Sequence, residues 1–136
     1  MTMIKIADKN LKLDEYIKPK PGVYKLIAFD KKENIIPINR FLGTDQNGIL
    51  YIGKSINLLK RMIKLRRGLI NPSEAIGHIA TRRIKSIKNI LNYIDINTLR
   101  ISIEYTDSPE SAKKFEATLL DKYTEEFGER PPLNKQ

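Results

Sequence analysis

Three stretches of the chain are rich in apolar, strand-forming residues, and this pattern predicts three β-strands. The first strand covers residues 22–29, GVYKLIAF, and the second covers residues 49–52, directly after the tight-turn dipeptide Asn47-Gly48. In the third, residues 99–105, the alternation is strict, which predicts one packed face and one solvated face.

Apolar residues recur at helical spacing in three other stretches. One helix is expected after Gly53 with Ser55 as its N-cap, and another at about residues 79–93. The last helix has clear boundaries, since Ser108 can cap its start and Gly128 follows its end. Together these elements predict an α+β fold, with a small antiparallel sheet of three main strands flanked by helices.

The chain has 136 residues, which fits one domain with a proper hydrophobic core. Residues 1–21 hold a short helical candidate stopped by prolines, and we interpret them as an N-terminal arm. Residues 22–136 are expected to form the single domain. Residues 30–47 have turn-forming residues at both ends and contain Pro37, so this insertion is predicted to be an edge strand or an extended loop.

Composition excludes several classes of site. The sequence has no cysteine, which excludes disulfides, thiolate catalysis, zinc fingers and iron–sulfur clusters, and its single histidine excludes histidine-rich metal sites. Charged residues are spread through the first twenty positions, and no apolar run approaches the length of a membrane span. We therefore expect a cytoplasmic protein without a membrane partner.

The net charge of +9 is concentrated in the middle of the chain. Residues 49–93 contain one acid, Glu74, and the following basic residues: Lys54, Lys60, Arg61, Lys64, Arg66, Arg67, Arg82, Arg83, Lys85 and Lys88. A one-sided positive field of this kind favours a polyanionic partner such as nucleic acid. The alternative is a solvated face that only keeps the protein soluble.

Two features are chemically unusual. Tyr51 places a phenol in an aliphatic strand close to Lys54 and Arg61, which suggests phosphate chemistry or, alternatively, a core tyrosine beside a solvated helix. Glu116 falls near the middle of the apolar stripe of the last helix. A buried carboxylate needs a cation, a metal or hydrogen-bond donors, so Glu116 belongs either to a site or to an internal salt bridge, for example with Arg61.

Five motifs, in order over residues 22–134, resemble the GIY-YIG nuclease superfamily, the catalytic domain of GIY-YIG endonucleases. They are Gly22-Val23-Tyr24, Tyr51-Ile52-Gly53 followed by Lys54, Arg61, Glu116, and Pro131-Pro132-Leu133-Asn134. The resemblance spans nearly the whole chain. It implies a small antiparallel sheet with flanking helices and the metal-dependent hydrolysis of a nucleic-acid phosphodiester, with DNA as the expected substrate.

The resemblance also implies roles for single residues. Glu116 would hold one Mg²⁺ (or Mn²⁺), because a lone carboxylate that leaves several waters in place suits this ion. Arg61 would bind the scissile phosphate, and Lys54 would add positive charge beside it. Either Tyr24 or Tyr51 would position or deprotonate the attacking water, and Tyr24 is favoured.

Asn134 would form hydrogen bonds near the metal carboxylate or the phosphate. Further contacts with the substrate are expected from Gly53, Lys60, Lys64, Arg66, Arg67, His78, Arg82 and Arg83. The chain has little room beyond the core and residues 30–47. Specificity would therefore be low, or would come from a protein partner or a homodimer.

Two departures from the family pattern keep alternatives open. The family commonly has His or Tyr four residues after the arginine, where this chain has Leu65. A nucleic-acid-binding module without catalytic activity is therefore one alternative, and a ribonuclease or RNA-binding protein is another. His78 could supply an imidazole from another direction, or could be packed or contact phosphate. The second departure is the insertion at residues 30–47, which could contact substrate or a partner.

Overall fold

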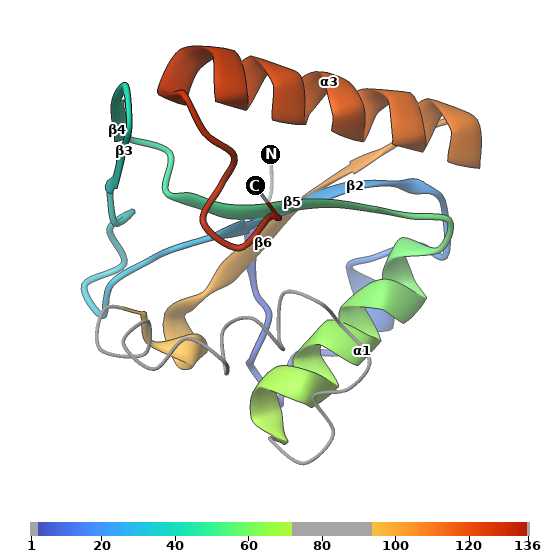
Figure 1. Ribbon diagram of the computed structural model, residues 1–136. Coiled ribbons are helices and arrows are strands. Elements are labelled where there is room, and N and C mark those ends of the chain that lie inside the picture. Colours follow the sequence, from blue (N-terminus) through green and yellow to red (C-terminus); the bar gives the residue numbers. More distant parts are fainter. Residues whose placement is uncertain (1–2, 72–93, 136) are drawn as a thin grey trace.

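The computed structural model describes residues 3–71 and 94–135 and contains a four-stranded antiparallel sheet (Figure 1). The strands lie in the order β1, β6, β2, β5. Their bounds are Met3–Lys5 for β1, Gly22–Ile27 for β2, Ile49–Ser55 for β5 and Arg100–Tyr105 for β6. The three predicted main strands are confirmed as β2, β5 and β6, and the N-terminal arm adds the short strand β1.

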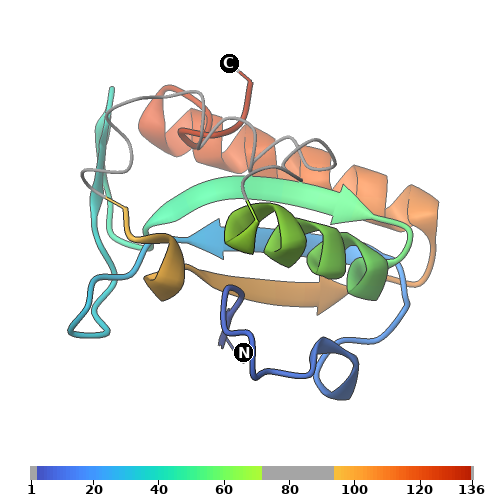
Figure 2. The ribbon, with the colours of Figure 1, turned by 90° about the horizontal axis from the view of Figure 1, so that it is seen from below.

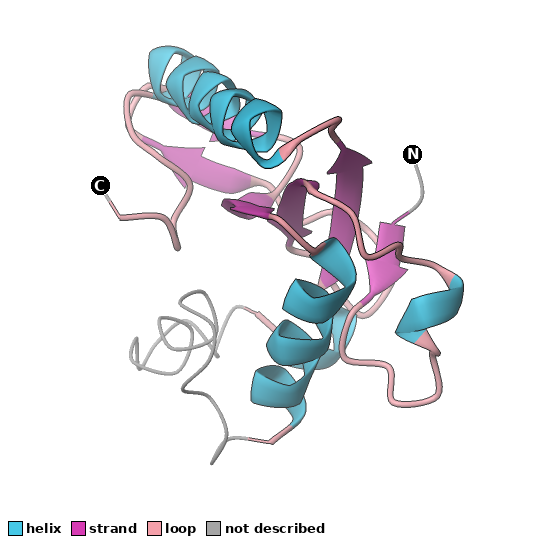
Figure 3. Ribbon diagram, turned by 90° about the vertical axis from the view of Figure 1, so that its right-hand side faces the viewer, coloured by secondary structure: helices cyan, strands magenta, loops and turns pink. Residues whose placement is uncertain are grey.

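Two α-helices cover opposite faces of this sheet (Figures 1 and 2). They are α1 (Leu58–Ile70) and α3 (Pro109–Phe127). Figure 3 shows the strands lying between them. The described residues also contain two short 3₁₀ turns, η1 (Leu13–Glu15) and η4 (Ile96–Thr98). The α+β class is confirmed. The second predicted helix, residues 79–93, lies outside the described residues.

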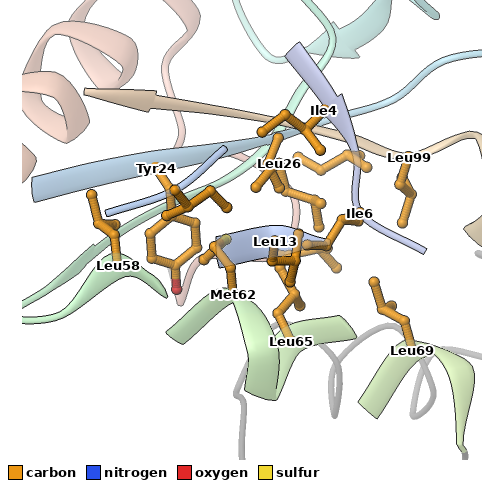
Figure 4. Packing of buried hydrophobic residues seen from close by; sticks show 14 of the residues in the cluster. Ile4, Ile6, Leu13, Tyr24, Leu26, Leu58, Met62, Leu65, Leu69 and Leu99 are labelled. Carbon is orange, nitrogen blue, oxygen red and sulfur yellow. The ribbon is translucent and has the colours of Figure 1, made fainter. Parts of the chain in front are cut away.

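Side chains of β2 alternate between two separate hydrophobic cores. Tyr24 and Leu26 pack on the α1 side together with Leu65, whereas Val23 and Ile52 pack on the α3 side. Figure 4 shows the first of these cores, with Tyr24 directed from β2 toward α1. Because α3 covers the second face at β2 and β5, the prediction of one solvated face for the third strand holds for Glu104 but was wrong for Ser102.

The third predicted strand shows where that prediction fails. Ser102 was expected to face solvent, but its exposed fraction is only 3%. Tyr105 was expected to face the core, yet it is exposed at the end of β6. The alternation correctly separates the two sides of the strand. It does not reveal that α3 packs on the polar side.

The link between β5 and α1 differs from the prediction in two ways. Gly53 and Ser55 belong to β5, so the strand continues past the expected exit. The N-cap of α1 is Asn57, whose side chain accepts a hydrogen bond from the backbone N–H of Lys60 at 3.0 Å. Ser55 was therefore wrongly predicted as the cap. Its hydroxyl instead bonds to the backbone of Asn57 just before the helix begins.

The insertion at residues 30–47 contains a separate two-stranded hairpin, β3 (Ile38–Arg40) and β4 (Gly43–Asp45). Its Arg40 forms an ion pair of 2.6 Å with Glu129, just beyond α3. The buried Asp45 accepts hydrogen bonds from the Tyr123 hydroxyl at 3.0 Å and from the backbone N–H of Ile49 at 3.0 Å. The insertion is thus anchored to the end of α3 and to the start of β5.

The boundaries of α3 agree with the prediction. Ser108 is the N-cap and forms a capping box with Ser111, and Gly128 ends the helix with a left-handed φ of 78°. Within residues 3–71 and 94–135, no helix combines the length and the apolar character needed to cross a bilayer.

Candidate active site

The pairing of β2 with β5 brings two phenols together over a glycine. Tyr24 lies opposite Gly53, and Tyr51 projects from the same face of β5 two residues earlier. The ring centroids of Tyr24 and Tyr51 are 6.0 Å apart. A Cβ added to Gly53 would lie 2.6 Å from the Tyr24 hydroxyl oxygen and 2.7 Å from Tyr51 Cε1. Only glycine leaves room for both rings, so Gly53 positions the phenols.

Tyr24 is deeply buried, with an exposed fraction of 2%. Burial raises the pKa of its phenol well above the ordinary value, and the neighbouring Tyr51 raises this pKa further, partly through a hydrogen bond between the two side chains. Arg61 lowers the pKa and Glu116 raises it. The Tyr24 phenol is therefore neutral at ordinary pH.

Lys54 and Glu116 lie on the other face of the sheet. Lys54 pairs with Val23, whose side chain packs on the α3 side, and its Nζ is 3.6 Å from Glu116 Oε1. The side chains of Lys54 and Glu116 are 44% and 20% exposed. An ion pair with this exposure contributes little to stability. The salt bridge considered for Glu116 is thus formed with Lys54.

The phenols on the α1 side and the ion pair on the α3 side meet around β5, the strand at this edge of the sheet. The charges of Arg61 and Glu116 both affect Tyr24, which places the two groups within electrostatic reach of it. The arrangement combines two phenol groups, two cations and one partly exposed carboxylate. Such a combination can bind a phosphate and can take up a proton.

A hollow of about 290 Å³ opens at the start of α1 and includes Arg61. Its lining residues are Ser55, Ile56, Asn57, Lys60, Arg61 and Lys64. The three cations lie beside the N-terminus of the helix, where the helix dipole also favours an anion. Lys60 and Lys64, predicted to contact substrate, therefore lie at the same hollow as Arg61.

Arg66 has a different environment. Its Nη1 donates hydrogen bonds to the backbone carbonyls of Asp8 and Leu11, so this guanidinium holds the N-terminal arm against α1. We therefore leave Arg66 out of the proposed substrate surface. Arg67 is exposed near the end of α1 and lines an adjacent hollow of about 310 Å³ with Ile63. The other predicted substrate contacts, His78, Arg82 and Arg83, lie outside the described residues.

Asn134 lies against the outer edge of β5. Its side-chain oxygen accepts a hydrogen bond from the backbone N–H of Ile52 at 3.0 Å, and its side-chain nitrogen donates to the carbonyl of Ile52 at 2.9 Å. The neighbouring Leu133 N–H donates to the carbonyl of Leu50 at 2.9 Å. Asn134 thus fixes the C-terminal segment on β5, next to Tyr51.

Leu65, the main departure from the family pattern, is fully buried on the core side of α1 (Figure 4). It packs in the same core as Leu13, Met62 and Tyr24. A histidine at this position would enter the core and would need a hydrogen-bond partner there.

Two residues of the hollow, Ile56 and Asn57, were not predicted from the sequence. Asn57 could have been found, because an asparagine directly before an apolar helical run is itself a capping signal. No sequence signal marked Ile56, since it reads as one more apolar residue of the helix.

Among the described residues, no group of three or more Asp, Glu or His side chains could hold a metal ion. Glu116 is a single, partly exposed carboxylate whose charge reaches the buried phenol of Tyr24, and the cationic hollow at the start of α1 could hold a phosphate. This set suits Mg²⁺, which commonly uses one or two carboxylates and takes its other ligands from water and substrate phosphate. The residues present therefore fit such an ion.

No protein-family model matches this chain, and a search of curated proteins finds no match. Among solved structures, the chain is similar to the GIY-YIG N-terminal endonuclease domain of UvrC from Thermotoga maritima. A point mutant of that domain bound to its catalytic divalent cation is 21% identical, with 93% of this chain and 100% of that chain covered and a TM-score of 0.45. The magnesium-bound domain is also 21% identical, with 92% and 100% covered and a TM-score of 0.44.

The likeness to these domains agrees with the resemblance predicted from the motifs. At this identity and TM-score it transfers neither an activity nor the role of any residue to this chain.

Proposed function

We propose that this chain is a metal-dependent endonuclease that hydrolyses DNA phosphodiester bonds. One observation supports this proposal above the others, namely that two phenols, two cations and a carboxylate gather around Gly53 at one edge of the sheet. These residues come from β2, β5, α1 and α3. A merely structural role for one phenol or one ion pair would not require all of them in the same place.

Arg61 would bind the phosphate, because its planar guanidinium group matches the phosphate oxygens and is permanently charged. Lys60 and Lys64 line the same hollow and would contact flanking phosphates. Lys54 would add positive charge from the α3 side of β5. The positive field of the chain would draw a polyanionic strand toward this edge.

Glu116 is the residue that would hold Mg²⁺ or Mn²⁺. When bound, such an ion supplies Lewis-acid stabilisation of the charge that develops on the phosphate and the leaving oxygen. Glu116 is paired with Lys54 in the structure, so Lys54 must share or release this carboxylate. The exposed fraction of 44% leaves the Lys54 side chain room to turn toward the phosphate.

A water molecule would attack the phosphorus atom while the bond to the leaving oxygen breaks, and the leaving oxygen would take a proton from solvent. A tyrosine in its phenolate form, favoured by the nearby positive charges, would take the proton from the attacking water. The raised pKa of Tyr24 weighs against the prediction that Tyr24 is this base. We therefore assign proton uptake to Tyr51, which is less buried, and assign to Tyr24 the orientation of the Tyr51 hydroxyl.

The proposal is tested by incubating the wild-type protein with supercoiled, branched and single-stranded DNA in Mg²⁺ or Mn²⁺. Wild type should cut at least one of these DNAs, and Glu116→Gln should lower the rate by about a hundredfold or more. The matched control is Glu125→Gln on an exposed position of the same helix, which should cut like wild type. Equal cleavage by Glu116→Gln and wild type would overturn the assignment of Glu116.

A second candidate is a nucleic-acid-binding module without catalytic activity. The observation that favours it is the Lys54–Glu116 ion pair, which gives the carboxylate a purely structural partner. This candidate predicts salt-sensitive binding without cleavage. Matched DNA and RNA strands in the same assay would separate a deoxyribonuclease from a ribonuclease. Selectivity through a protein partner or a homodimer stays a prediction.

A further inference from the structure

Ile56 is an apolar side chain exposed at the edge of the proposed site. It lies in the turn between β5 and α1 and has an exposed fraction of 72%, whereas its neighbours Ser55 and Leu58 are buried. A single exposed aliphatic residue is ordinary on a protein surface. The position of Ile56 is less ordinary, because it lines the same hollow as Lys60, Arg61 and Lys64.

Hydrogen bonds on both sides hold the turn that carries Ile56. The Ser55 hydroxyl donates to the carbonyl of Asn57 at 2.9 Å and accepts from the N–H of Asn57 at 3.0 Å. Beyond the turn, the N–H of Leu58 donates to the carbonyl of Lys20 at 2.9 Å. Ile56 therefore projects from a fixed backbone.

An isoleucine contributes nothing to binding a phosphate. A nucleic-acid strand, however, presents apolar base faces next to its phosphates, and a strand held by Arg61 would bring a neighbouring nucleotide against Ile56. In a continuous duplex those faces are stacked on other bases. Apolar side chains that contact them act as wedges at unstacked steps, or pack on bases that are already unpaired.

We propose that Ile56 packs against an unstacked base beside the bound phosphodiester, so that the site prefers nucleic acid whose base is unpaired at this position over continuous duplex. This inference rests on the proposed function and names the substrate feature that the same site selects. Single-stranded segments, branches and frayed ends all present such a base.

Two DNA duplexes of the same sequence test the inference, one fully paired and one with a single unpaired base beside a labelled phosphodiester. Wild type should cut the second duplex faster. Ile56→Ala should lower kcat/KM on that duplex by about five- to tenfold, consistent with the loss of one base contact, and should change cleavage of the paired duplex by less than twofold. Met3→Ala, which changes an exposed apolar residue of β1 at the opposite edge of the sheet, is the matched control and should cut both duplexes like wild type.

A second measurement keeps the inference separate from catalysis. With 2-aminopurine at the unpaired position and EDTA to prevent cleavage, saturating wild-type protein should change the fluorescence, and Ile56→Ala should give less than half of that change. Equal signals from the two proteins, or an equal loss of cleavage on both duplexes, would overturn the role of Ile56. If wild type cuts no DNA but the fluorescence difference is found, the proposed nuclease activity fails and the base contact stands.

Discussion

The two halves of the site are held in different ways. On the α1 side, Tyr24 is 2% exposed and its ring is fixed by the hydrophobic core and by the absence of a side chain at Gly53. On the α3 side, Lys54 and Glu116 are partly exposed and are linked by a contact of 3.6 Å. Packing determines the geometry of the phenols, whereas charge alone holds the ion pair together.

Because of this difference, substitutions on the two sides of the sheet should affect stability and activity differently. Changes on the α1 side should affect folding as well as activity, because the phenols share a core with the rest of the domain. Changes on the α3 side should affect activity with little change in the free energy of unfolding.

The largest effect on stability is expected from Leu65→His, which places an imidazole in the core of the α1 side. We expect the free energy of unfolding to fall by about 2–5 kcal/mol, without a gain in cleavage, because a Leu side chain is lost from the core and a polar ring is buried. Urea unfolding measures the change, and Ile63→His on the exposed side of α1 is the control. A stable Leu65→His protein with faster cleavage would show that position 65 serves the site.

Gly53→Ala tests whether the small residue sets the position of the phenols. The added methyl group would lie 2.6 Å from the Tyr24 ring, so we expect a loss of about 1–3 kcal/mol in the free energy of unfolding and a large loss of cleavage. Gly43→Ala, where an added Cβ meets no atom within 4 Å, should behave like wild type in thermal unfolding and in cleavage. Unchanged activity of Gly53→Ala would rule out this explanation.

Tyr24→Phe should change how stability depends on pH at the alkaline end. The pKa of Tyr24 is raised in the folded protein, so below about pH 10 the phenol is neutral in both states and has no effect on this dependence. Above that pH the unfolded chain releases the proton first, and the folded state loses about 1.4 kcal/mol per pH unit until the folded pKa is reached. Tyr24→Phe should remove this loss.

Urea titrations at pH 9 and pH 11 compare the stability of Tyr24→Phe with that of wild type. The exposed Tyr16 provides the control, because Tyr16→Phe should keep the alkaline loss of the wild type. An identical pH dependence of Tyr24→Phe and wild type would mean that the phenol ionises as easily in the folded protein as in the unfolded chain.

The smallest effect on stability is expected from Lys54→Met on the α3 side. An exposed ion pair contributes at most about 1 kcal/mol, so the free energy of unfolding should change by less than that. Cleavage should nevertheless fall by about tenfold or more, because a positive charge beside the phosphate is lost. Lys113→Met, on an exposed position of α3, should alter neither quantity. A marked loss of stability in Lys54→Met would show that the ion pair is structural.

Strand positions and the boundaries of α3 could be predicted from the sequence because their signals are local. Alternation along residues 22–29 and 99–105 defined the two sides of each strand, and Ser108 and Gly128 defined the ends of the helix. The register of β2 with β5 is not local. The sequence therefore could not show that Gly53 lies opposite Tyr24, although both belonged to the motifs of the predicted family.

Which basic residues line the site and which bind other parts of the protein was the hardest feature to predict from the sequence. Arg61 and Arg66 look alike in the sequence, yet one lines the hollow and the other binds the carbonyls of the N-terminal arm. The difference depends on where residues 8–11 pack, which is tertiary information. The partner of Glu116 was uncertain for the same reason, since Lys54 and Arg61 were both near the site in the sequence.

The contact of the C-terminal segment with β5 should also hinder edge-to-edge pairing of this strand with a second molecule. Leu133 and Asn134 occupy the backbone hydrogen-bonding groups of Leu50 and Ile52 at the outer side of the sheet. An uncovered strand at that position would be a template for pairing with the same strand of a second molecule. The segment that carries Asn134 thus keeps this side of the sheet closed to other chains while it leaves Gly53 to Ser55 beside the hollow.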